Sequence, residues 1–200
     1  LSDAPDAKGI GALLVDREME GVSFGKREPL MGFRGIETRD IAFDSVRVPR
    51  ENLIVPAGGF GRLMSAFGLE RCGNATQSLG LAAAALEQAT EYVQERTAFG
   101  KPIVDFQAVQ LRLAEMAMQV DAARLLIYRA AANAAHNPDG LPDVYESSTA
   151  KCFANEMVRS VTANGMQVMG GYGYHKHYGM EQRVRDGFAW GIAGGTTDVQ

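Results

Sequence analysis

Cysteine, histidine and tryptophan are scarce in this chain of 200 residues, which has two, three and one of them. Cys72 and Cys152 lie eighty positions apart without CxxC spacing, so neither a zinc centre nor a disulfide framework is supported. Two reduced thiols are typical of a cytosol-type compartment. We favour a bacterial cytoplasm, with a mitochondrial matrix as the alternative.

Long apolar runs are also missing, because charge or glycine interrupts each of them, and this argues against a membrane span. Residues 1–20 are acidic and lack an apolar centre, so they do not resemble a signal peptide. The net charge is −4 with both signs interspersed, which is not the basic excess of a nucleic-acid-binding surface. An apolar content of 46% with 22% charged residues is that of an ordinary globular protein.

Common nucleotide-binding and nucleophile motifs do not occur either. The glycine-rich segment "GGYGYHKHYG" has Lys176 where a GxGxxG motif needs its third glycine, and there is no GxxxxGK[ST] phosphate loop. No serine lies in a GxSxG elbow. His175 and His177 form an HxH pair with no further ligand at useful spacing, which favours a solvated loop pair over a metal site.

The first fifty residues are predicted to be β structure, because they form short segments rich in glycine and β-branched residues between turn residues. In one segment Ile41, Phe43, Val46 and Val48 alternate with one slip, a pattern typical of a half-buried strand with a β-bulge. The region starts without a recognisable first element. We therefore expect the chain to be the latter part of a longer protein.

Helical periodicity begins near Gly59. The first predicted helix is rich in alanine and free of proline, and "RTAFGKPI" interrupts it. A second helix follows, in which apolar residues recur at steps of three and four until "HNPDGLPD" supplies a turn. A third helix is expected from about Val144 to Met169 and a short one near 179–189. The apolar stripe of the second helix consists of Phe106, Val109, Leu113, Met116, Val120, Ala123 and Ile127.

The fold class that follows is α+β. Residues 1–53 are expected to form a β segment, and residues 54–200 an antiparallel helical bundle. Near the end of the chain, Thr196 or Thr197 is expected to cap one more helix.

Three segments, in order, resemble those of a single enzyme family. They are "VRVPRENLI", "ERTAFGKPIVDFQAVQLRLAEMAMQVDAARLLIYRAA" and "QVMGGYGYHKHYGMEQRVRD", and the family is that of the acyl-CoA dehydrogenases. The resemblance covers nearly the whole chain. It implies the latter part of a central β-domain, barrel- or sandwich-like, joined to a C-terminal antiparallel four-helix bundle. The family's N-terminal helical domain would lie outside this chain.

The resemblance also implies a flavin adenine dinucleotide (FAD) site shared between subunits. Arginine suits a pyrophosphate because its planar guanidinium makes paired charge-assisted hydrogen bonds, and glycine lets a backbone approach closely. Without the surrounding pattern, Arg96 would be a solvated helix-end charge and Gln107 a polar rim residue. By motif position, Arg96, Thr97, Phe99 and Gln107 would reach the cofactor of a neighbouring subunit. Gln167, Val168, Met169, Gly170 and Gly171 would approach the adenosine end, and Thr196, Thr197 and Asp198 would present a helix N-terminus to the cofactor.

The base that most of this family uses is missing. Oxidation of an acyl-CoA to the 2-enoyl thioester needs a carboxylate that takes the α-proton while the flavin accepts hydride from the β-carbon. It also needs a donor that stabilises the thioester oxygen. In most of the family the base is a glutamate at the position that is Gly194 here. A minority, of the isovaleryl- and long-chain type, carries it on the first bundle helix, where this chain has Glu70 followed by Arg71.

The resemblance therefore implies that Glu70 is the base and that the N–H of Gly194 donates to the thioester oxygen. An apolar, water-poor pocket is expected around Glu70, whose alternative is a surface glutamate paired with an arginine. The space left by a glycine at 194 favours a branched, cyclic, aromatic or otherwise bulky acyl group. The residues expected to line the thioester pocket are Gly68, Leu69, Arg71 and Gly195.

The family implies a homotetramer, a dimer of dimers, that passes electrons to an electron-transferring flavoprotein. Two rivals share the binding features but differ in chemistry: a thioester desulfinase and an enoyl-CoA reductase. A third is a catalytically silent subunit that completes a partner's flavin site. The need for Glu70 distinguishes a dehydrogenase from a desulfinase, because the dehydrogenase requires this residue and the desulfinase does not.

Overall fold

The structure, a computed structural model, describes residues 6–200. These residues form two compact units. The strand unit consists of the chain up to Leu30 together with Arg34–Phe67, and the helix unit consists of Met31–Phe33 together with Gly68–Gln200.

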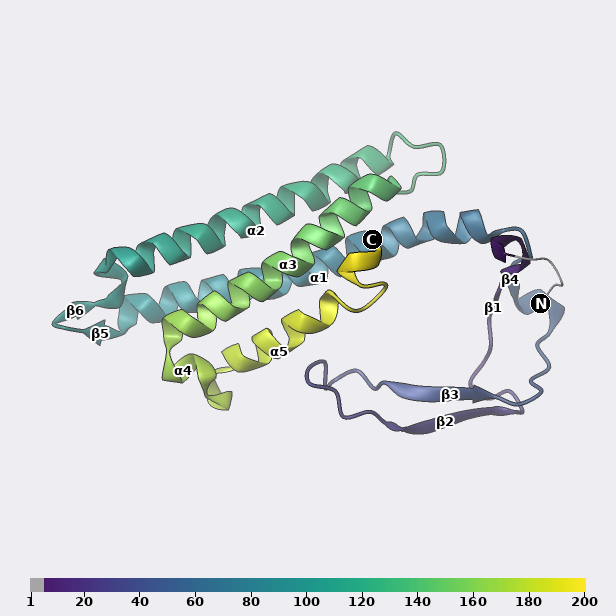
Figure 1. Ribbon diagram of the computed structural model, residues 1–200, viewed down its shortest axis with the longest axis horizontal. Helices are drawn as coiled ribbons and strands as arrows, with labels where there is room; N and C mark the ends of the chain where they lie inside the picture. The colour runs from purple at the N-terminus through teal and green to yellow at the C-terminus, as the bar shows by residue number, and fades with distance from the viewer. Residues whose placement is uncertain (1–5) are drawn as a thin grey trace. The chain divides into compact units, whose positions relative to one another are not determined.

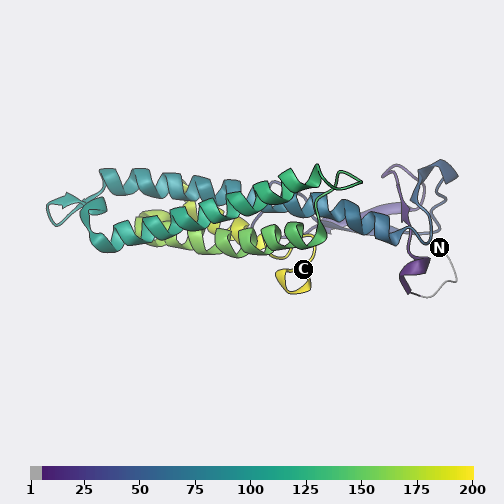
Figure 2. The same ribbon diagram turned by 90° about the horizontal axis from the view of Figure 1, so that it is seen from above.

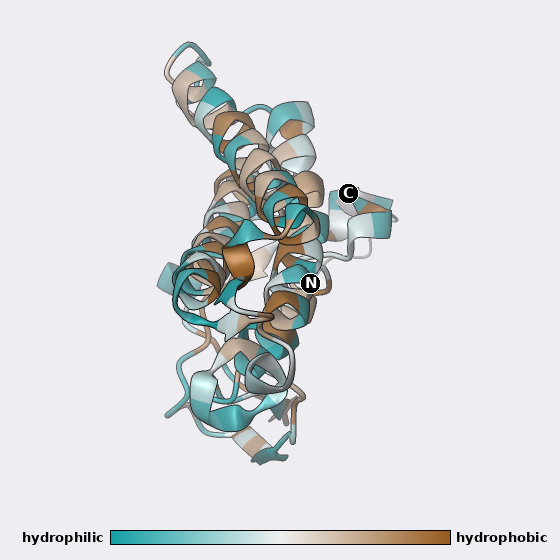
Figure 3. Cartoon of the chain, turned by 90° about the vertical axis from the view of Figure 1, so that its left-hand side faces the viewer, coloured by the Kyte–Doolittle hydropathy of each residue, from teal (hydrophilic) through white to brown (hydrophobic). Residues whose placement is uncertain are grey.

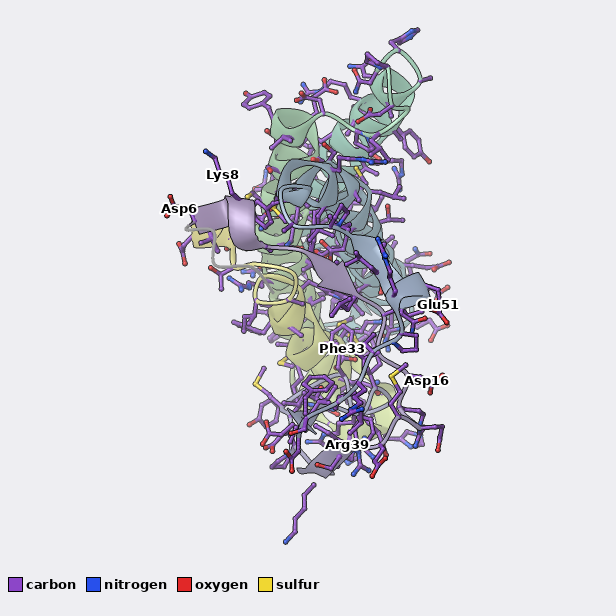
Figure 4. All side chains as sticks on the ribbon, turned by 90° about the vertical axis from the view of Figure 1, so that its right-hand side faces the viewer. Asp6, Lys8, Asp16, Phe33, Arg39 and Glu51 are labelled. Carbon is purple, nitrogen blue, oxygen red and sulfur yellow. The ribbon has the colours of Figure 1, made fainter. Side chains whose placement is uncertain are left out.

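The strand unit contains short antiparallel pairs, β1 with β4 and β2 with β3. Asp6, Lys8 and Glu51 project from its ribbon (Figure 4). The first two turns of the long helix α1 also belong to this unit. The bounds are η1 Asp6–Gly9, β1 Ala12–Leu13, β2 Val22–Arg27, β3 Arg39–Phe43, η2 Arg50–Asn52 and β4 Leu53–Val55, where η marks a 3-10 helix.

The predicted alternating strand is wrong in its length and in its burial. β3 ends at Phe43, because Ser45 has a φ of +53° and bends the chain, and Val46 and Val48 lie beyond the bend. Ile41 is 53% exposed and Phe43 60% exposed. An isolated two-stranded pair leaves both of its faces open to solvent. The irregular register occurs in the partner strand β2.

The helix unit is a bundle in which α3 packs along α2 and α5. Figures 1 and 2 both show α2 and α3 side by side. Among the described residues, no helix is long and apolar enough to cross a membrane. The bounds are α1 Phe60–Glu95, β5 Thr97–Ala98, β6 Lys101–Pro102, η3 Ile103–Asp105, α2 Gln107–Ala134, α3 Val144–Met169, α4 Gly171–Tyr174, η4 Lys176–Tyr178, α5 Met180–Trp190 and η5 Thr197–Val199.

Alanine, valine and methionine side chains fill the centre of the bundle. Around each helix in Figure 3, hydrophobic and hydrophilic residues alternate, as expected for helices with one apolar face. The predicted apolar stripe is confirmed in its last four residues, which are buried on α2, while its first three residues are half-buried. The core includes Ala75, Ala82, Ala85 and Ala89 of α1, Met116, Val120, Ala123 and Ile127 of α2, Ala150, Ala154, Met157, Val158 and Val161 of α3, and Met180 of α5.

The ends of α3 and α5 follow ordinary capping chemistry. The Asp143 carboxylate accepts hydrogen bonds from the N–H groups of Tyr145 (2.8 Å) and Glu146 (3.2 Å), which begins α3. Gly170 follows α3 with a φ of +59°, and Gly179 precedes α5 with a φ of +74°. Both conformations favour glycine, which marks the end of one helix and the start of the other. The observed bounds of α3 and α5 confirm the two helices that the sequence predicted.

The segment Met31–Phe33 holds α5 in place within the helix unit. The Phe33 N–H donates to Asp186 Oδ1 (2.7 Å), and the ring of Phe33 meets that of Trp190 edge-on, with centroids 4.5 Å apart. An Arg185 nitrogen donates to the carbonyl of Met31 (2.7 Å). The turn that follows Trp190 therefore starts from a fixed helix end.

Candidate active site

A buried lysine holds the turn formed by Gly194 and Gly195. Lys151 lies on α3 and is fully buried. Its Nζ donates hydrogen bonds to the carbonyl oxygens of Gly194 (2.5 Å) and Gly195 (3.0 Å). Burial lowers the pKa of Lys151 below its ordinary value, and the negative charge of Glu70 opposes that shift. A buried ammonium group needs such partners, so the lysine and the turn stabilise one another.

Two further buried side chains, those of Asn155 and Asn74, hold the residues just before this turn, and Ser78 binds one of them. Asn155 Nδ2 donates to the carbonyl of Trp190 (2.8 Å), and Asn155 Oδ1 accepts from Ser78 Oγ (2.8 Å). Asn74 Nδ2 donates to the carbonyls of Trp190 (3.5 Å) and Ala193 (3.4 Å). Polar atoms of α1 and α3 thus bind carbonyl oxygens along residues 190–195. Buried hydrogen bonds of this kind favour one conformation of these residues, although the buried Asn74 Oδ1 has no partner among the described residues.

Glu70 and Gly194 occupy adjoining space. Gly194 has a φ of +64°, a conformation that favours glycine. A Cβ added to Gly194 would lie 2.6 Å from Glu70 Oε1 and 2.9 Å from Oε2. Within residues 6–200, the N–H of Gly194 makes no hydrogen bond. The turn therefore brings together a carboxylate and a backbone donor that is available to a ligand, and a glycine at 194 is what makes room for the carboxylate.

The expected pocket around Glu70 is not formed by the residues described here. Glu70 is exposed, and Leu69 beside it is 62% exposed, because these two residues lie on the solvent-facing side of α1, between the buried Gly68 and Cys72. The prediction of an apolar, water-poor environment is therefore wrong for the chain by itself. The alternative, an ion pair with an arginine, is not formed either, since the described salt bridges do not include Glu70.

The other residues predicted to line a thioester pocket differ in their surroundings. Gly68 is buried, and a Cβ there would lie 2.7 Å from the carbonyl oxygen of Pro142. Arg71 is half-buried, and its Nε donates to Gln200 Oε1 (2.6 Å). A Cβ on Gly195 would lie 2.6 Å from Gln200 Nε2. Gly68 therefore serves a close approach between α1 and a loop, whereas Arg71 and Gly195 lie at the turn.

A second cluster lies where α1 and α3 end. Arg96 and the segment Val168–Gly171 line one pocket of about 590 Å³, together with several aromatic side chains. The Arg96 guanidinium lies over the ring of Tyr172, 5.7 Å from its centroid. Cβ atoms added to Gly170 and Gly171 would meet nothing within 4 Å. An arginine beside open glycine backbone suits an extended anionic group such as a dinucleotide, so these residues fit the expected cofactor.

Burial raises the pKa of the Tyr92 hydroxyl in this pocket, and the positive charge of Arg96 opposes that shift. Tyr172 and Tyr178 stack edge-on, with centroids 4.9 Å apart. The HxH pair lines the same pocket. His175 Nδ1 accepts a hydrogen bond from the N–H of His177 (3.1 Å), which caps a short turn.

The remaining residues predicted to bind the cofactor do not line this pocket. Thr97, Gln107 and Gln167 are exposed, and Phe99 is 96% exposed with a φ of +53°. The predicted helix near the end of the chain is the single 3-10 turn η5. Thr196 precedes that turn but makes no capping hydrogen bond through its side chain. Thr197 donates from Oγ1 to Glu156 Oε1 (3.3 Å), and Asp198 is exposed.

Sequence reasoning missed Lys151, Asn155 and Asn74. A signal was present, because Lys151 and Asn155 lie four positions apart among the buried residues of α3, as do Asn74 and Ser78 among those of α1. Polar residues at that spacing within a core stripe require buried partners. Their partners, the carbonyls of residues 190–195, become visible only in the folded chain.

The fold and the site define a helical-bundle protein in which the Glu70 carboxylate lies beside the turn that Lys151 holds at Gly194. The profile of the "Acyl-CoA dehydrogenase, C-terminal domain" family matches residues 57–200. The chain belongs to the acyl-CoA dehydrogenase family, as the sequence motifs predicted.

Individual relatives have several different activities in their names. The chain is 41% identical over 194 residues to the "Caffeyl-CoA reductase-Etf complex subunit CarC" of Acetobacterium woodii, covering 96% of this chain and 50% of that protein. It is 38% identical over 199 residues to the "3-sulfinopropanoyl-CoA desulfinase" of Cupriavidus necator, covering 96% and 49%. The structure matches butyryl-CoA dehydrogenase from Megasphaera elsdenii with a TM-score of 0.88 at 36% identity, covering 96% and 50%. The chain thus spans about half the length of these relatives.

Proposed function

We propose that this chain provides the acid–base half of an FAD-dependent acyl-CoA dehydrogenase, an oxidoreductase that converts an acyl-CoA to the 2-enoyl-CoA. The observation that carries the proposal is the contact between Glu70 and Gly194. The carboxylate fills the volume in which a side chain at position 194 would begin. A base on α1 and a glycine on the turn are thus sterically matched, which supports the relocated base that the sequence predicted.

The roles of the two residues follow from their chemistry. Glu70 would take the proton from the α-carbon of the acyl group, since a carboxylate at the turn can reach a substrate that binds against it. The Gly194 N–H, which is free within the described chain, would donate to the thioester oxygen as that oxygen gains negative charge. Bound FAD would supply the hydride acceptor for the β-carbon.

FAD would be held by the pocket of Arg96 and Val168–Gly171, with the exposed Thr97, Phe99 and Gln107 reaching it from the same end of the bundle. Met169, in that pocket, lies eighteen residues beyond Lys151 on α3. At a rise of about 1.5 Å per residue, the two clusters are about 27 Å apart. That separation supports a site completed by a second copy, in which the Arg96 pocket of one subunit faces the turn of another.

The surface of α2 supports self-association. Leu111, Met118 and Leu125 recur at steps of seven and are 63%, 65% and 68% exposed, and Tyr128 continues the apolar surface at 61%. Such a stripe is typical of a helix that packs against another helix. The proposal therefore includes a homotetramer, an electron-transferring flavoprotein as electron acceptor, and a cytoplasmic location. We also propose a bulky acyl group for the substrate, as the sequence predicted. The volume beside Gly194 is occupied by the Glu70 carboxylate, so the series of acyl-CoAs in the experiment below has to decide this point.

The experiment is anaerobic bleaching of the flavin by straight, branched and aromatic acyl-CoAs, in the flavin-loaded protein and in Glu70→Gln. Glu87→Gln is the matched control, since Glu87 is an exposed glutamate on the same helix. We expect rapid bleaching by one class of thioester, lost in Glu70→Gln and kept in Glu87→Gln. Bleaching that survives in Glu70→Gln would place the base elsewhere.

Relatives named as a reductase and a desulfinase motivate a second candidate function. In a desulfinase the protein would hydrolyse the carbon–sulfur bond of a sulfino-acyl thioester. Water would supply the third oxygen of sulfite and the hydrogen that replaces sulfur on the carbon, and Glu70 would not be needed. Absence of bleaching by any acyl-CoA, with flavin bound and sulfite released equally by the wild type and by Glu70→Gln, would establish that reading. Flavin that binds only after a partner protein is added would instead indicate a silent subunit.

A further inference from the structure

We propose that Lys151 is a positioning residue for the thioester, because together with Asn74 it fixes the two peptide planes that meet at Gly194. This inference rests on the proposed function, in which the Gly194 N–H receives the thioester oxygen. Lys151 does not touch the substrate in this scheme. It acts through the turn.

The first plane is the peptide that joins Ala193 to Gly194. A trans peptide is planar, with its carbonyl oxygen and its N–H pointing in opposite directions. Asn74 Nδ2 binds the Ala193 carbonyl from the bundle side at 3.4 Å. The Gly194 N–H on the same plane must therefore point away from the bundle, where the described chain offers it no acceptor.

The second plane is the peptide that joins Gly194 to Gly195. Its carbonyl oxygen is bound by Lys151 Nζ at 2.5 Å, and the next carbonyl, of Gly195, is bound at 3.0 Å. Because Lys151 binds the second plane and Asn74 contacts the first, the φ of +64° at Gly194 is restrained from both sides. A flexible glycine is thereby made into a rigid donor.

The residue type at 151 follows from this requirement. Two carbonyl oxygens converge at a fully buried point on α3, and only a side chain with several N–H donors satisfies both. Gln200 also approaches these oxygens, at 3.3 and 3.4 Å, but from the exposed side of the turn. Because Gln200 is more accessible to solvent than Lys151, its hydrogen bonds do not replace the two buried ones.

The test uses Lys151→Met, which keeps the length of the side chain and removes its donors. The flavin-loaded variant is expected to lose about 10²-fold in the rate of flavin bleaching, the effect of misplacing a reacting group by about 1 Å. Its KM is expected to change far less. Thr162→Val is the matched control, because Thr162 is equally buried on α3 but bonds only to carbonyls of its own helix.

Two CoA ligands distinguish a loss of positioning at Gly194 from general damage to the binding site. A thioester with no hydrogen on its α-carbon binds without reacting, and the corresponding thioether to CoA lacks the carbonyl oxygen. We expect Lys151→Met to weaken binding of the thioester by about tenfold, roughly one hydrogen bond, and to leave binding of the thioether unchanged. Equal weakening of both ligands, or wild-type bleaching in Lys151→Met, would overturn the proposal.

A milder variant covers the case in which Lys151→Met does not fold. Lys151→Gln keeps an N–H donor on a shorter stem and is expected to show a smaller loss with the same preference between the ligands. Failure of both variants to bind flavin would make Lys151 purely structural and would also overturn the proposal. If none of the acyl-CoAs bleaches the flavin of the wild type, the proposed function fails. The binding of the two ligands still tests the role of Lys151.

Discussion

The carboxylate of Glu70 lies where a side chain of residue 194 would start, 2.6 Å from the Cβ position of Gly194. The carboxylate is the end of a flexible side chain, so a larger residue at 194 would displace it rather than unfold the bundle. Positions 70 and 194 are therefore coupled. The Glu70 carboxylate can keep its present position only while residue 194 has no side chain.

Gly194→Ala is expected to impair catalysis more than stability. The methyl group would displace the Glu70 carboxylate, and a non-glycine residue at a φ of +64° costs about 1–2 kcal/mol. Urea denaturation should show the free energy of unfolding lowered by that amount. Flavin bleaching should be at least about tenfold slower.

The matched control is Gly140→Ala, in a loop with a φ of +69° and nothing within 4 Å of its Cβ position. It should show a similar loss of stability and unchanged bleaching. If both variants bleached flavin at the same rate, the coupling between Glu70 and residue 194 would not matter to catalysis.

Gly68→Ala is expected to destabilise the protein, because its Cβ would lie 2.7 Å from the backbone oxygen of Pro142. Backbone cannot move aside cheaply, and overpacking of this kind costs about 1–3 kcal/mol. Gly73→Ala lies five residues further along the same helix, at an exposed position with nothing within 4 Å. The free energy of unfolding of Gly73→Ala should rise by about 0.5–1 kcal/mol, since alanine is the better helix former. Thermal unfolding of the two variants measures the difference, and a shift of the same sign in both would contradict it.

Both cysteine thiols are expected to react slowly near pH 8. Burial raises the pKa of Cys72, as does the negative charge of Glu146, and burial likewise raises the pKa of Cys152. A raised pKa leaves less thiolate at a given pH, and the thiolate is the reactive form. Alkylation by iodoacetamide, followed by mass spectrometry, should be slower than for free cysteine and should accelerate as the pH rises above 9. Labelling of Cys152 at the rate of free cysteine would show that the thiol is not shielded.

The apolar stripe on α2 is expected to support self-association. Met118→Glu places a charge in the centre of the stripe, between Leu111 and Leu125. We expect it to shift the sedimentation coefficient toward smaller species and to lower flavin retention, because the proposed cofactor site needs a second copy. Gln110→Glu adds the same charge at an exposed polar position of this helix and should leave both unchanged. An unaltered sedimentation profile for Met118→Glu would place the interface elsewhere.

Helical features were predictable because each depends on neighbours in the sequence. The apolar spacing around Met116 and Val120 defines a buried face. An aspartate such as Asp143, whose carboxylate caps the first turn, is typical of the residue before a helix. The strand prediction failed because Ser45 in a left-handed conformation has no signature in the alternation of its neighbours.

The candidate site was predictable only in part. Glu70 and Gly194 were identified by position in a motif, and the structure adds the contact between them, 124 positions apart in sequence. Lys151 was not identified, because its role depends on carbonyl oxygens, which every residue carries and no sequence distinguishes. The exposure of Glu70 could not be read from periodicity either, since it depends on which surfaces of α1 are covered.

The single uninterrupted helix α3 sets both the distance and the angle between two clusters of this chain, the turn held by Lys151 and the pocket of Arg96. Lys151 and Asn155 lie toward one end of it and Met169 at the other, with no proline or positive φ between them. Inserting one residue midway would turn the far cluster by about 100° and shift it by about 1.5 Å. The number of residues between Lys151 and Met169 therefore decides how the two clusters are placed along and around this helix.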